Sequence, residues 1–144
     1  MKTKQKKGFT LIEIMVVIAI LGILMAVSLV LLSGPSKLAS DNSVKANLLS
    51  IRKQSEIYYI TNNNYGVQIS SCNTGVFGDP TVLSALDEIR DNIDGNKQII
   101  CTTSVSGSTW AISVNKLRKA NTTWCVDSTG NSKSNSTSAS GSCN

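Results

Sequence analysis

Residues 9–32 read FTLIEIMVVIAILGILMAVSLVLL, and this stretch decides how the rest of the chain is organised. Its only clearly polar residues are Thr10, Glu13 and Ser28. A run of this length and composition spans a bilayer as a helix. Lysines precede it, and no charge follows Glu13 until Lys37, which predicts a cytoplasmic N-terminus and an extracytoplasmic remainder. The sequence therefore predicts a single-pass cell membrane protein that faces outward.

An ordinary secretory signal is the main alternative for the apolar stretch. Such signals have a shorter apolar region that ends in a small-residue cleavage site. Here the run is followed by Ser33, Gly34 and Pro35, without an Ala-x-Ala pattern. A glycine, Gly8, stands instead where the charged residues stop and the apolar run begins. This arrangement disfavours removal of the whole segment.

The net charge of +5 is concentrated at one end of the chain. Four of the fourteen basic residues lie in the first seven positions: Lys2, Lys4, Lys6 and Lys7. Without residues 1–8, ten basic residues face nine acidic ones, a net charge of +1. The basic residues therefore form an N-terminal targeting segment and do not indicate a nucleic-acid-binding surface. A nucleic acid stays a possible but unsupported partner.

Glu13 is the anomaly in the apolar stretch. Sixteen Leu, Ile, Val and Phe residues between positions 9 and 32 favour insertion by roughly 0.3–0.6 kcal/mol each, whereas one central charge costs roughly 3 kcal/mol. An ionisable group inside an apolar span is expected to have a partner, although a carboxylate tolerated near the membrane edge is the alternative. Cleavage after Gly8 would create a partner, because the new α-amino group of Phe9 is a cation that another subunit can present to Glu13. Such a pair would set the register between neighbouring helices.

The run KKGFTLIEIMVVIAILGILMAV, residues 6–27, resembles the class III signal of type IV pilins and pseudopilins. The resemblance implies that a dedicated aspartic peptidase cuts after Gly8 on the cytoplasmic face and methylates Phe9. It also implies that Glu13 is the carboxylate that pairs between subunits. Many pilins carry a proline inside the apolar part of the helix, whereas the first proline here is Pro35. We therefore expect a kink or a local loss of helix at 33–36.

Beyond Pro35 the apolar residues adopt helical spacing on one face, at Val44, Leu48, Ile51 and Tyr58. This pattern predicts one long helix over 9–61 with a bend, which the Asn-rich turn before Gly66 terminates. A second amphipathic helix is predicted over 81–93. Strands are predicted at 98–103, 109–114 and 123–127.

Together these elements predict an α+β fold, in which a long N-terminal helix packs on a small antiparallel sheet of three or four strands, as in pilins. The expected organisation has three parts: a basic leader peptide 1–8, a transmembrane and assembly helix 9–34, and an extracytoplasmic head domain 35–144. Within the head, the polar stretch 128–142 is expected to be a flexible, exposed Ser-rich tail.

Four cysteines lie on the side of the membrane where oxidation is permitted: Cys72, Cys101, Cys125 and Cys143. Four cysteines allow three pairings, and the sequence alone does not decide among them. Pairing Cys72 with Cys101 and Cys125 with Cys143 is favoured, because the second bond would close the tail. A zinc site is disfavoured, because the chain has no histidine and no Cys-x-x-Cys spacing. The run DNIDGN, residues 91–96, contains calcium-type ligands but fails the EF-hand spacing.

The sequence disfavours an enzyme and indicates no cofactor, because it has no histidine and no Gly-rich phosphate loop, and its thiols have a structural use. A monomeric binding module anchored by the apolar helix would leave Gly8, Phe9 and Glu13 unexplained. The resemblance implies a structural subunit of a type IV pilus-like filament, or alternatively a pseudopilin of a type II secretion or DNA-uptake machine. Its expected partners are identical or related pilin subunits, a prepilin peptidase and an inner-membrane assembly platform. Its expected location is the cell membrane before assembly and a cell-surface filament afterwards.

Overall fold

The computed structural model describes residues 8–31, 33–67, 70–93, 98–115, 117–118 and 120–144, without the side chains of residues 29–34. The chain divides into two compact units, Met1–Ser36 and Lys37–Asn144. The leader lysines lie outside the described residues, and so do residues 94–96, the second half of the DNIDGN run. The two units are considered separately below.

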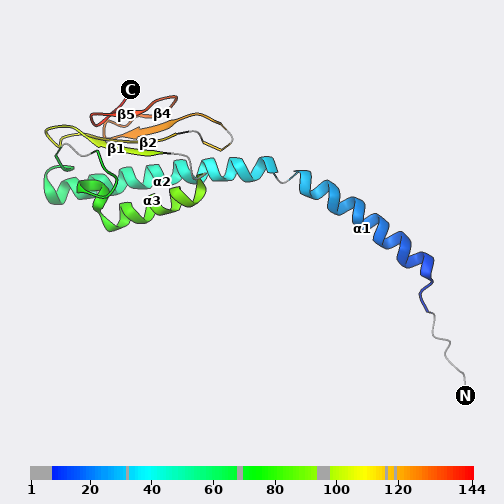
Figure 1. Cartoon of the computed structure of the whole chain (residues 1–144). Coiled ribbons are helices and arrows are strands. Elements are labelled where there is room, and N and C mark those ends of the chain that lie inside the picture. Colours follow the sequence, from blue (N-terminus) through cyan, green and yellow to red (C-terminus); the bar gives the residue numbers. More distant parts are fainter. Residues whose placement is uncertain (1–7, 32, 68–69, 94–97, 116, 119) are drawn as a thin grey trace, which may run out of the picture. The chain divides into compact units, whose positions relative to one another are not determined.

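The first unit contains helix α1, Leu11–Leu31, and the start of helix α2, Ser33–Asn62 (Figure 1). Pro35 is the third residue of α2, in the first turn, where a missing backbone N–H removes no intrahelical hydrogen bond. The sequence predicted a kink or a local loss of helix at 33–36, and the loss does not occur, since these residues are helical. Of the helix predicted over 9–61 with a bend, the described residues 11–31 and 33–61 are helical.

In the second unit, α2 turns one face toward the core. Val44, Leu48 and Ile51 on that face are fully buried, as the helical spacing predicted. The helix ends where Asn63 adopts the left-handed conformation, with φ 55°. The Asn63 backbone N–H donates to the Tyr59 carbonyl at 2.7 Å, which satisfies one of the last carbonyls of the helix.

Helix α3, Pro80–Asn92, follows a short 3₁₀ turn η1, Gly75–Gly78. Its start is fixed by Asp79, whose Oδ1 accepts from the backbone N–H groups of Thr81 at 2.9 Å and Val82 at 3.3 Å. A proline at the first helical position suits this cap, because its φ is already helical. The helix predicted over 81–93 is confirmed, shifted by one residue.

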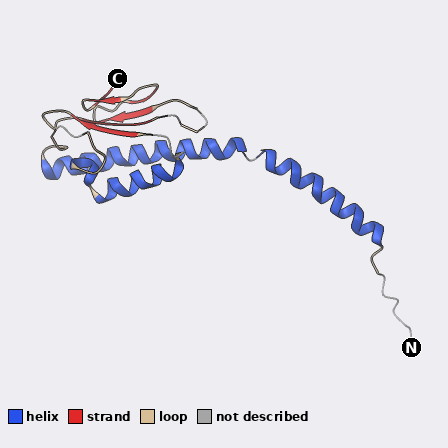
Figure 2. Ribbon diagram, viewed as in Figure 1, coloured by secondary structure: helices blue, strands red, loops and turns tan. Residues whose placement is uncertain are grey.

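A four-stranded antiparallel sheet has the strand order β1-β2-β3-β4. This sheet lies over α2 and α3 (Figure 2). Three of its strands fall where the sequence predicted them, which confirms the α+β class. The strands are β1 Ile99–Thr103, β2 Trp110–Val114, β3 Trp124–Asp127 and β4 Ser132–Ser134.

The two faces of the sheet differ in chemistry. Trp110, Ile112 and Val114 alternate along β2 and join the main core with α2 and α3. The Trp110 ring meets Phe77 and Tyr65 edge-on, with centroids 6.1 and 6.4 Å away. The opposite, outer face holds mostly small and polar residues, such as Ala111 and Ser113, together with the half-buried side chain of Ile100.

The C-terminal stretch covers this outer face. The sequence predicted 128–142 as a flexible, exposed Ser-rich tail, and residues 132–135 are exposed. This part of the chain nevertheless contributes three short strands, β4, β5 Ser138–Ala139 and β6 Ser142–Cys143, and Ser136 and Ser138 are 4% and 7% exposed. The prediction missed these strands because it counted only apolar residues, whereas hydrogen bonds and a disulfide hold this stretch.

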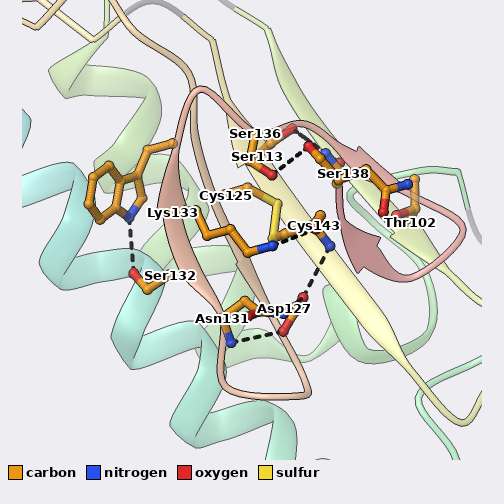
Figure 3. The surroundings of a disulfide bond; sticks show 12 residues. Thr102, Ser113, Cys125, Asp127, Asn131, Ser132, Lys133, Ser136, Ser138 and Cys143 are labelled. Atoms are coloured by element: carbon orange, nitrogen blue, oxygen red, sulfur yellow. Dashed lines mark hydrogen bonds between the residues drawn. A yellow bond between two sulfur atoms is a disulfide. The ribbon is translucent and has the colours of Figure 1, made fainter.

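Asp127 organises the stretch that follows it (Figure 3). Its buried carboxylate accepts from Thr129 N and Oγ1 at 3.0 and 2.7 Å, from Asn131 N and Nδ2 at 3.1 and 2.9 Å, and from Cys143 N at 3.0 Å. Burial alone would raise the pKa of the carboxyl, but the hydrogen bonds from Asn131, Cys143 and Thr129 outweigh it and hold the pKa below the ordinary 3.8. The carboxylate therefore joins the β3–β4 turn to the C-terminus.

We predict that Asp127→Asn lowers the free energy of unfolding at neutral pH by about 1–3 kcal/mol, because the new amide nitrogen faces donors where the native oxygen accepted. In the native chain, the Asp127 contribution is complete above pH 3.8 and is lost as the pH falls through the lowered pKa of the folded state. In the Asp127→Asn variant, the free energy of unfolding should therefore lack the loss at low pH that comes from this carboxylate. Guanidinium unfolding of the full chain in detergent micelles at pH 7 and pH 3, followed by tryptophan fluorescence, measures both effects.

Asp91→Asn is the matched control, because Asp91 is exposed on α3. Its stability should stay within about 0.5 kcal/mol of the parent. Equal losses in the two variants would contradict the role given to the Asp127 carboxylate.

Candidate functional site

Helix α1 presents an apolar surface that the chain itself does not cover. The window Leu11–Ser28 has a mean hydropathy of 2.7, and none of it is buried. At 1.5 Å per residue these 18 residues extend about 27 Å, close to the hydrocarbon thickness of a bilayer. Soluble proteins do not leave a continuous apolar surface of this size in water. The length and composition of α1 therefore suit surroundings of lipid or of other protein chains.

A capping box forms the start of α1. Thr10 N and Thr10 Oγ1 both donate to Glu13 Oε2 at 2.8 Å, and Glu13 N donates back to Thr10 Oγ1 at 3.4 Å. The Thr10 and Glu13 side chains thus satisfy backbone donors that the first turn leaves without partners. Sequence reasoning missed this motif, although the S/T-x-x-E pattern is readable directly in TLIE.

The capping box uses one oxygen of the Glu13 carboxylate. Within the described part of the chain, no hydrogen bond reaches Oε1. A carboxylate has about four acceptor positions, so Glu13 can hold the helix start and still receive a further donor. Its side chain therefore combines a structural contact within the chain and an unused acceptor.

The predicted cleavage and methylation residues lie just before this capping box. Gly8 and Phe9 precede the first helical residue, and the Phe9 side chain is 83% exposed. A side chain built at Gly8 would meet nothing within 4 Å. Among the residues that the structure describes, none covers the Gly8–Phe9 bond, and Phe9 lies four positions before Glu13 in the sequence.

The four cysteines lie in the second unit, far along the sequence from Glu13. They form the disulfides Cys72–Cys101 and Cys125–Cys143, the pairing that the sequence analysis favoured. Cys101 belongs to the main core, whereas Cys125 and Cys143 form a small separate cluster with Ala111. Among the described residues, no group of three or more His, Cys, Asp or Glu side chains is placed to hold a metal ion.

Sequence reasoning missed a second apolar surface, which we term the open face of α2. It comprises Leu38, Leu49, Ile57 and Ile60, all of which are exposed. Leu38, Leu49 and Ile60 recur every eleven residues, close to three helical turns, so they form one line along the helix. This line lies away from the core-facing residues, such as Leu48. The eleven-residue spacing was the signal that could have revealed it.

Comparison with known proteins connects these features. A family model described as the prokaryotic N-terminal methylation motif matches residues 3–32. The type IV wide pilus major component PilA4 of Thermus thermophilus is 47% identical over 62 residues, which are 43% of this chain and 47% of that protein. Type II secretion system core protein G of Aeromonas hydrophila is 34% identical over 65 residues, which are 45% of this chain and 46% of that protein.

The corresponding core protein G of Dickeya chrysanthemi is 34% identical over 62 residues, which are 43% of this chain and 40% of that protein. The chain thus matches somewhat under half of the length of these curated relatives, and no solved structure matches it significantly. The chain carries the prokaryotic N-terminal methylation motif at the start of an apolar helix, and it shares sequence with a type IV pilin and with pseudopilins of type II secretion systems.

Proposed function

We propose that the chain is the structural subunit of a type IV pilus-like filament. It enters the membrane as a prepilin, is cleaved after Gly8 and polymerises through α1. The observation that carries the proposal is the fully exposed apolar helix with a carboxylate in its first turn. Lipid covers that helix before assembly, and identical or related subunits cover it in the fibre. Repetition of one head-to-tail contact then gives an open helical filament.

Glu13 and Phe9 give the contact its register. Cleavage after Gly8 places a new ammonium group on Phe9, at the end of the apolar helix. In a fibre core, that ammonium needs an anionic partner, because a buried charge without one is strongly destabilising. The unused Oε1 of Glu13 on a neighbouring subunit supplies the partner without breaking the capping box. Methylation of the Phe9 nitrogen keeps its positive charge and so leaves this pairing possible.

The proposal includes two partners besides the subunits themselves. A prepilin peptidase on the cytoplasmic face would reach the exposed junction at Gly8, and an inner-membrane assembly platform would move the processed chain out of lipid. The chain is then a single-pass cell membrane protein before assembly and part of a cell-surface filament afterwards. None of these proposed steps requires the chain to catalyse a reaction.

The open face of α2 supports a fibre over a monomeric anchored module. A module held by one helix has no need of an apolar line on the solvent side of a second helix. In a fibre, an apolar line on α2 has a use. Because α2 directly follows α1 in sequence, neighbouring copies can cover Leu49 and Ile60 on this helix. Large exposed apolar surfaces generally mark contacts with other proteins.

A pseudopilin of a type II secretion or DNA-uptake machine is the second candidate. The observation that favours it is the similarity to several proteins named type II secretion system core protein G. The composition of purified cell-surface filaments separates the two candidates. A pilus subunit is their dominant component, whereas deletion of a secretion pseudopilin blocks export of secreted proteins and leaves surface pili in place.

We predict that the assembled protein begins at Phe9 and carries an added methyl group. The Gly8–Phe9 bond is uncovered and lies where the charged leader meets the apolar helix. Intact-mass measurement of the sheared filament fraction and of the membrane fraction tests this prediction. The membrane pool of a strain without the peptidase serves as the uncleaved control. Filaments whose subunits still begin at Met1, or begin after Ser33, would contradict cleavage after Gly8.

We predict that Glu13→Val leaves membrane insertion intact and lowers filament yield at least tenfold. Insertion should persist because the substitution removes a charge that costs roughly 3 kcal/mol at the centre of a span. Assembly should fail because the Phe9 ammonium loses its counter-charge, a loss of about 3–5 kcal/mol for a buried pair. The membrane-bound pool and the sheared filaments are quantified in the same cells.

Two further variants separate the charge of Glu13 from its role in the capping box. Glu13→Gln keeps an acceptor for the cap but removes the charge, so it should assemble as poorly as the valine variant. Thr10→Val weakens the cap by about 1 kcal/mol but keeps the charge, so it should retain most assembly. Full filament yield from Glu13→Gln would show that assembly does not need the Glu13 charge. That result would favour the hypothesis of a monomeric anchored module.

A further inference from the structure

The last nine residues, 136–144, form a separate layer on the outer face of the sheet, which we term the C-terminal strap (Figure 3). Ser138 N donates to Ser113 Oγ at 3.1 Å, and Ser138 Oγ donates to the Ile100 carbonyl at 2.8 Å. Gly141 N donates to Thr102 Oγ1 at 3.2 Å. The strap is thus attached to β1 and β2 by hydrogen bonds through short side chains.

The strap has almost no apolar anchor. Its only apolar side chains are those of Ala139 and Cys143, and Cys143 lies in a small cluster apart from the main core. Hydrogen bonds made on folding replace hydrogen bonds to water, so each contributes little net stability, whereas every ordered residue loses backbone entropy. Its turn also places Ser140 in the left-handed region, with φ 48°, which disfavours a non-glycine residue. The Cys125–Cys143 bond is therefore the contact on which the order of the strap depends.

The other disulfide has a different setting. Cys101 lies within the main core, and the segment after Cys72 is held by Val76 and Phe77, both fully buried. Val76 N also donates to the Tyr65 carbonyl at 2.9 Å. Apolar burial would therefore hold this segment in place without its disulfide. The two bonds offer a matched comparison between a segment with an apolar anchor and one without.

We propose that the C-terminal strap is a redox-released cover of the outer sheet face. Cys125 and Cys143 are 0% and 3% exposed, so the bond reacts when the strap opens transiently. An external dithiol is the reductant: one of its thiolates attacks a sulfur of the Cys125–Cys143 bond and releases the other cysteine as a thiolate. The second thiol of the reductant then attacks the mixed disulfide and releases the remaining cysteine. Cys125 and Cys143 become thiols, and the dithiol becomes a cyclic disulfide, so two electrons and two protons pass to the protein. The strap then detaches, while the core around Trp110 stays folded.

Release changes the surface in a defined way. Asp127 loses the Cys143 N–H, one of its five hydrogen-bond donors, and keeps the four from Thr129 and Asn131. Ser113 and Ala111 become accessible from the outer side. A polar sheet face and a reactive thiol at Cys125 are thus presented only under reducing conditions. This inference concerns the second unit alone and does not depend on filament assembly.

Hydrogen exchange on the full chain in detergent micelles tests the proposal. In the double variant Cys125→Ala/Cys143→Ala, the amides of Ser138 and Gly141 should exchange on the order of 100-fold faster, the effect expected from opening a loop of 18 residues. Amides of β1 and β2 should keep their protection. The matched control, Cys72→Ala/Cys101→Ala, should leave the strap protected.

Two outcomes overturn the proposal: full protection of the strap in the Cys125→Ala/Cys143→Ala variant, or equal loss of protection in the strap and in β1 and β2. A second measurement needs no folding of that variant. The Cys72→Ala/Cys101→Ala chain is treated with dithiothreitol and iodoacetamide, and both remaining thiols should be alkylated while tryptophan fluorescence stays native. Thiols that resist alkylation until denaturant is added would contradict release of the strap.

Discussion

The rest of the molecule depends on one constraint: α1 carries an apolar surface that the chain does not cover. Fourteen large apolar side chains from Phe9 to Val27 are exposed. Covering each is worth about 1.5–3 kcal/mol, so lipid or neighbouring chains contribute about 20–40 kcal/mol in total. That sum far exceeds the cost of one carboxylate in the same segment. The apolar surface thus determines the surroundings that suit the helix, and in the proposed filament Glu13 can add specificity to its capping contact with Thr10.

The second unit has the opposite problem, since it must hold together in water with few apolar residues. It concentrates them between the sheet and the helices, around Trp110 and Phe77. Polar contacts complete the structure elsewhere. Burial and then the hydrogen bond to Glu56 raise the pKa of Tyr65 to about 12, so its hydroxyl remains a donor to the Glu56 carboxylate in alkaline solution as well. Lys45 lies over the Trp124 ring at 4.2 Å and joins α2 to the strand β3.

The sequence predicted elements whose signals are local. The apolar run gave α1, helical spacing gave the buried face of α2, and alternation around Ile112 gave β2. The strands after Asp127 had no such signal, because the donors at positions 129, 131 and 143 that converge on one carboxylate, together with the Cys125–Cys143 disulfide, hold them in place. At the candidate site, Glu13 was predicted from its chemistry. Its capping contact with Thr10 is readable from the spacing but was not predicted, because the expected partner of Glu13 lies on another chain.

The contact with Thr10 bears on how two subunits can meet. A free glutamate side chain would lose rotamer freedom when an ammonium group binds to it, and this loss would weaken the pairing. Here Thr10 already fixes the carboxylate through Oε2, so much of that loss is incurred when the helix folds. Oε1 carries the same delocalised charge and has no hydrogen bond within the described chain. In the filament that we propose, the incoming ammonium would therefore meet a preorganised acceptor, and one short contact would set the register of the helices.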